Sequence, residues 1–177
     1  MPEQHCLSKG QQTMETDTAT LPSTETQSAN LSDPHVVVHG TGRNFVQEIT
    51  AGNHWFQADE PLSFGGTDLA PDPHDYLMAS LGACTSMMVG LNARKRKWPL
   101  EDINVSLKHS RIHAKDCEEC RTEDGMIDRI DVAVELTGPL TDEQRSELMK
   151  TAATCPIHRA LKGEINVRLQ AVNHEAN

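Results

Sequence analysis

The sequence has few aromatic residues and no long apolar run. Aromatic side chains make up 3% of its 177 residues, and no stretch approaches the about 18 uninterrupted apolar residues that a membrane-spanning helix requires. The N-terminus also lacks the basic and then apolar pattern of a signal peptide. We therefore expect a cytoplasmic protein that has no membrane partner.

Positive charge is scarce as well. The formal net charge is −10, whereas binding to the phosphates of nucleic acids requires clustered lysine and arginine side chains. The basic run 94–97 follows a predicted helix, where cations complement the negative end of the helix dipole. We therefore expect no nucleic-acid partner.

The five cysteines are an odd number, which does not suit the paired disulfide framework of a secreted domain. With 37% hydrophobic residues, a chain of this length can bury one core. Residues 1–33 are dominated by Ser, Thr, Gln and Glu, which predicts a disordered tail in which Cys6 has no role. We expect a single domain over residues 34–177.

The order of apolar patterns predicts an α+β fold rather than alternating α/β units. Three short strands are followed by a long helix, two further strands, a broken helix and a closing strand that alternates Ile165, Val167 and Leu169. The helix is apolar enough to need wide cover, which favours a homodimer. The predicted segments are strands at 35–39, 45–49 and 54–58, a helix at 73–96, strands at 103–112 and 126–136, a helix opened by the capping box 141–144, and a short helix at 156–161.

Two cysteines are placed where thiol chemistry is possible. Cys84 follows Leu77 and Leu81 and precedes Met88 and Leu91 at steps of three and four, which places it on the buried stripe of the long helix or at its edge. Cys155 directly precedes a proline that suits a first helical position, so it is predicted to be the N-cap of the short helix. The pair is compatible with a redox couple, although from the residues alone an inert core cysteine is the favoured interpretation of Cys84.

Three segments carry a resemblance to a known family. They are 65–73, beginning Gly-Gly-Thr-Asp, the run Leu-Met-Ala-Ser-Leu-Gly-Ala-Cys that ends at Cys84, and Cys155 with the proline after it. In their order and spacing the chain resembles the OsmC/Ohr family (osmotically induced protein C and organic hydroperoxide resistance protein) over about residues 35–172. The resemblance implies an OsmC-like fold, an intertwined homodimer and a thiol peroxidase that reduces organic hydroperoxides in oxidative stress defence.

The resemblance also implies roles for individual residues. Cys84 would be the thiol that attacks the peroxide, and Cys155 would resolve the sulfenic acid to a disulfide that a dithiol reductant reopens. Arg43 matches the family's arginine, nine residues before Gly52 and eighteen before Pro61, and its guanidinium would hold the thiolate and a peroxide oxygen. A solvated arginine at a strand end is the alternative.

The sequence departs from the family pattern ten residues before the first cysteine, where peroxidase members carry a glutamate and this chain has His74. On an ideal helix His74 lies about 80° from Cys84, while Asp75 lies on the far side. His74 would shape or polarise the pocket but cannot pair with Arg43 as a carboxylate does. A second hypothesis is therefore a non-catalytic module of the same fold that binds a metal or an apolar small molecule.

Further histidines and cysteines lie in the second half of the chain. His158 is one helical turn beyond Cys155 and is either a base for that thiol or a structural histidine. A second group, consisting of His109, His113, Cys117 and Cys120, offers the ligand types of a structural zinc site. We favour a solvated loop over zinc because Glu118 and Glu119 crowd the thiols, and a local disulfide is a third option. We expect no cofactor and no resident metal.

Overall fold

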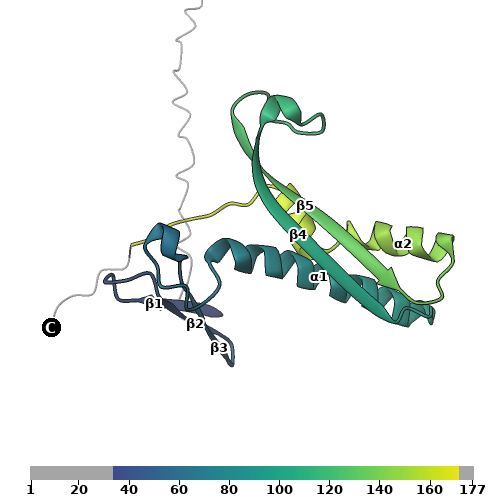
Figure 1. Cartoon of the computed structure of the whole chain (residues 1–177), viewed down its shortest axis with the longest axis horizontal. Helices are drawn as coiled ribbons and strands as arrows, with labels where there is room; N and C mark the ends of the chain where they lie inside the picture. The colour runs from purple at the N-terminus through teal and green to yellow at the C-terminus, as the bar shows by residue number, and fades with distance from the viewer. Residues whose placement is uncertain (1–33, 172–177) are drawn as a thin grey trace, which may run out of the picture. The chain divides into compact units, whose positions relative to one another are not determined.

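The computed structural model describes residues 34–171, and its first sheet is a three-stranded antiparallel meander (Figure 1). Strands β1 (Val36–Gly40), β2 (Gln47–Ala51) and β3 (His54–Ala58) pair in the order β1-β2-β3. Gly52 makes the tight turn between β2 and β3 at a φ of 58°, which a residue without a side chain adopts at little cost. The three predicted strands are confirmed.

The segment between β3 and the long helix is ordered around the carboxylate of Asp59, which is 2% exposed. Its oxygens accept hydrogen bonds from the Thr67 hydroxyl at 2.6 Å, and from the backbone N–H groups of Thr67 at 2.9 Å, Leu69 at 3.2 Å and Glu60 at 2.8 Å. The Thr67 bond and the backbone N–H groups outweigh burial and lower the pKa of Asp59 to about 2. This polar segment, which also contains the short 3-10 helix η1 (Leu62–Phe64), is therefore held by one charged group.

Helix α1 (Pro73–Arg96) has the predicted bounds. It begins at an Asp72 N-cap whose side chain accepts the Asp75 N–H at 2.8 Å in a capping box. At its other end the guanidinium of Arg96 lies 3.1 Å from a Glu147 oxygen and 4.7 Å from the centre of the Trp98 ring. The basic run is therefore part of a helix end, as its position predicted.

The buried stripe of α1 differs from the predicted one. Leu81 is 3% exposed, but Leu77 and Leu91 are 40% and 39% exposed and Cys84 is half-buried. The face that packs inward consists mostly of small residues because the neighbouring strand approaches closely: a Cβ at Gly82 would lie 2.8 Å from Leu107 Cδ1. The buried residues of the helix are Leu81, Gly82, Thr85, Val89, Gly90 and Ala93.

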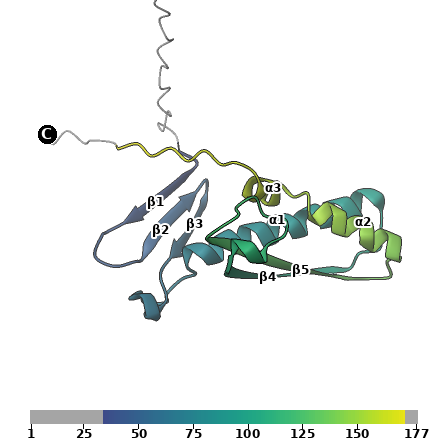
Figure 2. The ribbon, with the colours of Figure 1, turned by 90° about the horizontal axis from the view of Figure 1, so that it is seen from above.

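A second sheet and two helices complete the described part of the chain. Strands β4 (Asp102–His113) and β5 (Met126–Thr137) form a long antiparallel hairpin, with the 3-10 helix η2 (Ala114–Asp116) in the loop at its tip. Helices α2 (Asp142–Ala152) and α3 (Pro156–Lys162) follow, and α1 contacts β4, α2 and α3 (Figure 2). The core that joins them is a cluster of Val89, Ala93, Leu148 and Ala152. The α+β class is confirmed, as are the capping box at Thr141 and the short helix that begins at Pro156.

One predicted element is missing. Residues 163–171 form no strand, and Ile165, Val167 and Leu169 are 58%, 77% and 98% exposed. The prediction of a closing strand is wrong for the single chain, because within residues 34–171 no strand edge pairs with this segment.

Among the described helices none is long and apolar enough to cross a membrane. The predicted tail at 1–33, with Cys6, lies outside the described residues.

Candidate functional site

Cys155 is the N-cap of α3, as predicted, and its side chain is 0% exposed. Pro156 occupies the first helical position, where a missing N–H costs nothing. The Cys155 sulfur accepts the backbone N–H of His158 at 3.2 Å, so a thiol replaces the oxygen that usually caps a helix. The fold thus gives this sulfur a donor that favours its charged form.

Helix α1 brings two further side chains to this sulfur. The Thr85 hydroxyl lies 3.6 Å from the Cys155 Sγ, and the Cys84 thiol is among the groups that lower the pKa of Cys155. Cys155 is buried, and Cys84, the residue before Thr85 on α1, is half-buried. Thr85 was missed by sequence reasoning, although it follows Leu81 by four positions and so lies on the stripe that is actually buried.

The surroundings of Cys155 change its acidity. Burial raises the pKa of this thiol, but hydrogen bonds from the His158 backbone, the Thr85 hydroxyl, the Cys84 thiol and the Ile157 backbone outweigh it. The net effect lowers the pKa of Cys155 below that of an ordinary cysteine. The described residues therefore stabilise the thiolate of Cys155.

A small, mainly apolar cavity of about 150 Å³ lies beside Thr85 and His158, and neither Cys84 nor Cys155 is part of its wall. Thr85 and His158 are its polar members, and the rest of its wall comes from β5, α2 and the residue after α2. His158 therefore donates its backbone N–H to the sulfur and also lines the cavity. The residues that complete the wall are Val132, Val134, Met149, Ala152 and Ala153.

Arg43 and His74 do not join the thiol pair within residues 34–171. Arg43 is exposed between β1 and β2, where its backbone N–H donates to the Thr41 hydroxyl at 3.4 Å. The His74 ring instead stacks on His109, with centroids 5.4 Å apart and planes inclined by 22°. The contacts with Cys84 or Cys155 that the predicted roles of Arg43 and His74 require are therefore absent from the described part of the single chain.

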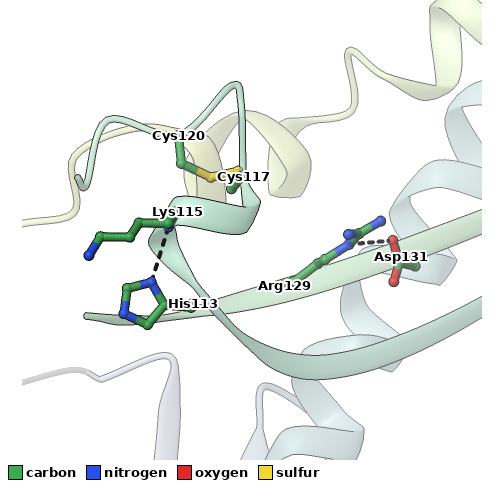
Figure 3. Close-up of a disulfide and its surroundings, with 6 residues drawn as sticks. All are labelled: His113, Lys115, Cys117, Cys120, Arg129 and Asp131. Carbon is green, nitrogen blue, oxygen red and sulfur yellow. Dashed lines mark hydrogen bonds and ion pairs between the residues drawn. A yellow bond between two sulfur atoms is a disulfide. The ribbon is translucent and has the colours of Figure 1, made fainter. Parts of the chain in front are cut away.

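Cys117 and Cys120 are joined by a disulfide in the loop between β4 and β5 (Figure 3). The two cysteines lie in the predicted loop and form the local disulfide that was the third option for them. His113 is also occupied, since its Nδ1 accepts the Lys115 N–H at 3.2 Å and its Nε2 lies 3.4 Å from Asp124. Residues 34–171 hold no cluster of three side chains suited to a metal ion.

Comparison with known proteins identifies one family and several solved structures of similar fold. The family model described as OsmC-like protein matches residues 66–170. No curated protein matches the chain. Among solved structures, the organic hydroperoxide resistance protein OsmC of Legionella pneumophila is 26% identical, with a TM-score of 0.53, and the alignment covers 72% of this chain and 88% of that one.

Two other solved structures are more distant in sequence and show the fold alone. An OsmC like protein from Mycoplasma pneumoniae is 18% identical, with a TM-score of 0.56 and coverage of 78% of this chain and 96% of the other. An organic hydroperoxide resistance protein from Elizabethkingia anophelis is 21% identical, with a TM-score of 0.54 and coverage of 72% and 86%.

Proposed function

The chain belongs to the OsmC-like protein family, and from this premise we propose that it is a thiol peroxidase that reduces organic hydroperoxides through Cys84 and Cys155. The name of the Legionella pneumophila protein to which it is similar supports this substrate class. A cytoplasmic dithiol serves as the reductant, and the reaction contributes to defence against oxidative stress.

The observation that carries the proposal is that α1 places the Thr85 hydroxyl 3.6 Å from the Cys155 sulfur, which brings the neighbouring residue Cys84 close to the start of α3. The Cys84 thiol is also among the groups that lower the pKa of Cys155. A sulfenic acid needs a second thiol nearby if it is to close to a disulfide before it is oxidised further. The mainly apolar cavity beside Thr85 suits the organic part of a hydroperoxide better than it suits water-like hydrogen peroxide.

The acidity of Cys155 suggests how the proton moves. The Cys155 thiolate takes the proton of the Cys84 thiol, and the Cys84 thiolate attacks the distal oxygen of the hydroperoxide. The O–O bond breaks, the alkoxide takes a proton from water and leaves as the alcohol, and Cys84 becomes a sulfenic acid. The Cys155 sulfur then attacks the Cys84 sulfur, and the leaving hydroxyl takes the Cys155 proton to form water. One hydroperoxide thus converts two thiols to a disulfide.

Arg43 and His74 can take part in the mechanism only if a homodimer brings them to the thiols. Each is exposed and makes no contact with the thiols within the described chain. Apolar side chains on β1 and along 165–169 are also exposed, which supports the expected homodimer because such surface is usually covered. We propose that dimer formation brings Arg43 to a thiol pair, where its guanidinium favours the thiolate of Cys84.

A second candidate function is a binding module of this fold without turnover. The placement of His74 and Arg43 away from the thiols favours it, because a peroxidase needs a cation beside its attacking sulfur. The ligand would be an apolar small molecule in the cavity beside Thr85. Such a module would leave both thiols reduced in the presence of a hydroperoxide.

The test is the reaction of the reduced protein with one equivalent of cumene hydroperoxide, followed by intact mass and thiol counting. We expect the wild-type protein to lose two protons through a Cys84–Cys155 bond, and Cys155→Ser to accumulate a sulfenic acid that dimedone traps. Cys84→Ser should not react. The variant Cys117→Ser/Cys120→Ser is the matched control and should react as the wild type does. Unchanged thiols in the wild-type protein would reject the peroxidase and favour the binding module.

A further inference from the structure

We propose that the Cys117–Cys120 disulfide is a second redox-active site, which exchanges with dithiol reductants independently of Cys84 and Cys155. The bond joins residues three apart whose Cα atoms lie 5.5 Å from each other (Figure 3). This is the C-x-x-C spacing found in dithiol oxidoreductases. The inference goes beyond the peroxidase function and does not rest on it.

The site is accessible. Cys120 is exposed and Cys117 is half-buried at the tip of the β4–β5 hairpin, whereas Cys155 is 0% exposed. Exchange requires a thiolate to approach along the S–S axis, and exposed disulfides are the labile ones. A bulky dithiol, such as one on another protein, can therefore reach the hairpin tip more easily than it can reach the buried pair.

The backbone hydrogen bonds at the base of the loop do not involve the Cys117–Cys120 disulfide. At the base of the loop the Ala114 N–H donates to the Gly125 oxygen at 2.8 Å, next to the last pair of the strand ladder, His113 with Met126. A disulfide that closes so short a loop removes little chain entropy, because that entropy grows with the logarithm of loop length. The hairpin should therefore stay folded when the bond opens, which a reversible couple requires.

The loop itself keeps the two thiols near each other. The Cys117 N–H donates to the Ala114 oxygen at 3.0 Å, and the Cys120 N–H lies 3.4 Å from the Cys117 oxygen. These backbone bonds form a turn that brings the side chains to the same end of the loop with or without the disulfide. Reoxidation then needs only a local movement of the two side chains.

The surroundings indicate which reductants the site prefers. The disulfide borders a cavity of about 470 Å³ whose wall includes the cross-strand pair Ile112 and Ile127. Carboxylates outnumber cations among its charged lining residues, which are Asp116, Glu118, Glu119, Asp128 and Arg129. Carboxylates near a thiol disfavour its thiolate and repel anionic thiols. Neutral and cationic thiols should therefore open the bond faster than anionic thiols of equal acidity.

The exchange is balanced in electrons and protons. A thiolate of the reductant attacks the sulfur of Cys120, the S–S bond breaks, and Cys117 leaves as a thiolate that takes a proton. The second thiol of the reductant then attacks the mixed disulfide and releases Cys120. Two electrons and two protons pass to the protein, and the reductant becomes a disulfide.

The test uses the full chain with Cys6→Ser/Cys84→Ser/Cys155→Ser, in which the two loop cysteines are the only thiols. The protein is equilibrated in glutathione buffers of different reduced-to-oxidised ratio, quenched in acid and labelled with N-ethylmaleimide, and the labels are counted by mass. We expect no labels in oxidising buffer, two in reducing buffer, and the same midpoint from both directions with the fold retained. Compared at equal thiolate concentration, cysteamine should open the bond several-fold faster than mercaptopropionate, and salt should reduce the difference.

Controls separate the outcomes. Adding Cys117→Ser should leave Cys120 able to form only a mixed disulfide with glutathione, and peptide mapping of the wild-type protein reports the same loop without any substitution. Thiols that stay reduced in every buffer, a bond that survives excess dithiothreitol in the folded protein, or a zinc ion that occupies the pair would each overturn the proposal. Because Cys84 and Cys155 are absent from the variant, a failed peroxidase test leaves this result unaffected.

Discussion

The hydroxyl of Thr85 lies 3.6 Å from the sulfur of Cys155, a residue 70 positions away in the sequence. This contact links the middle of α1 to the first turn of α3. Thr85 directly follows Cys84, the cysteine that was expected to attack the peroxide. A hydroxyl is a donor that favours a thiolate, and here it joins a backbone N–H in doing so. The acidity of the buried thiol therefore depends on a residue that contributes no reactive group.

Replacing Thr85 by valine should raise the pKa of Cys155, because the shape is kept while one hydrogen bond to the thiolate is lost. At neutral pH a smaller fraction of Cys155 is then ionised, so it should be alkylated more slowly. The measurement is the pH dependence of iodoacetamide labelling at Cys155, read by peptide mapping. Thr151→Val is the matched control, since the Thr151 hydroxyl bonds the Glu147 oxygen and touches no cysteine. Equal profiles for both variants would show that the Thr85 bond has no effect on the thiolate.

Gly82→Ala should destabilise the fold, because the added methyl group would lie 2.8 Å from Leu107 Cδ1. Overpacking of this kind costs about 1–3 kcal/mol, which lowers the Tm of a protein of this size by about 2–4 °C per kcal/mol. Urea unfolding measures the loss, with the exposed Ser80→Ala on the same helix as a control. Combining Gly82→Ala with Leu107→Ala should cost less than the sum of the two single changes. Strict additivity would argue against the contact.

Asp59→Asn should destabilise the protein at neutral pH, because an amide cannot accept hydrogen bonds as a carboxylate does. The folded pKa of about 2 is lower than the about 3.9 of an unfolded aspartate. The stability that the carboxylate contributes is therefore full above about pH 4 and is lost as the pH falls through about 2. The difference in unfolding free energy between wild type and Asp59→Asn should shrink over that range. The neighbouring, exposed Asp68→Asn should show no such trend.

Val38→Lys should weaken the proposed homodimer. Val38 is 57% exposed and pairs with Ile49, on the sheet face that also carries Phe56. Side chains alternate between faces, so Val37→Lys places the same charge on the opposite face and is the matched control. Sedimentation equilibrium should show a mass of two chains for the wild type and the control, and a shift toward one chain for Val38→Lys. A wild-type monomer would remove both the dimer and the role proposed for Arg43.

Much of the fold could be predicted from local patterns. The bounds of α1 follow from Asp72 and the proline after it, and the capping box at Thr141 marks the start of α2. These signals lie within a few residues of the structure that they specify. The family relationship was also visible, because its motifs keep their order along the chain.

What could not be predicted depends on contacts between distant segments. The buried stripe of α1 depends on how closely β4 approaches Gly82. The spacing of apolar residues along the helix gives no information on this distance. The prediction of a closing strand was wrong because alternation at Ile165 and Val167 leads to a strand only if a sheet edge is available to pair with it. In the site, the contact of Thr85 with Cys155 and the lowered pKa of Cys155 could not be predicted, because the groups that surround this thiol come from α1 and α3 together.

The cap of α3 is a sulfur atom, and this makes a piece of secondary structure sensitive to the oxidation state of the protein. A thiolate is a far better acceptor than a disulfide sulfur, so closing a bond to Cys84 would weaken the hold on the His158 amide. In amide hydrogen exchange, the first turn of α3 should then open more often in the oxidised protein, while the exchange of α2 stays unchanged. The redox state of one side chain would thus be readable in the backbone dynamics of the helix that it begins.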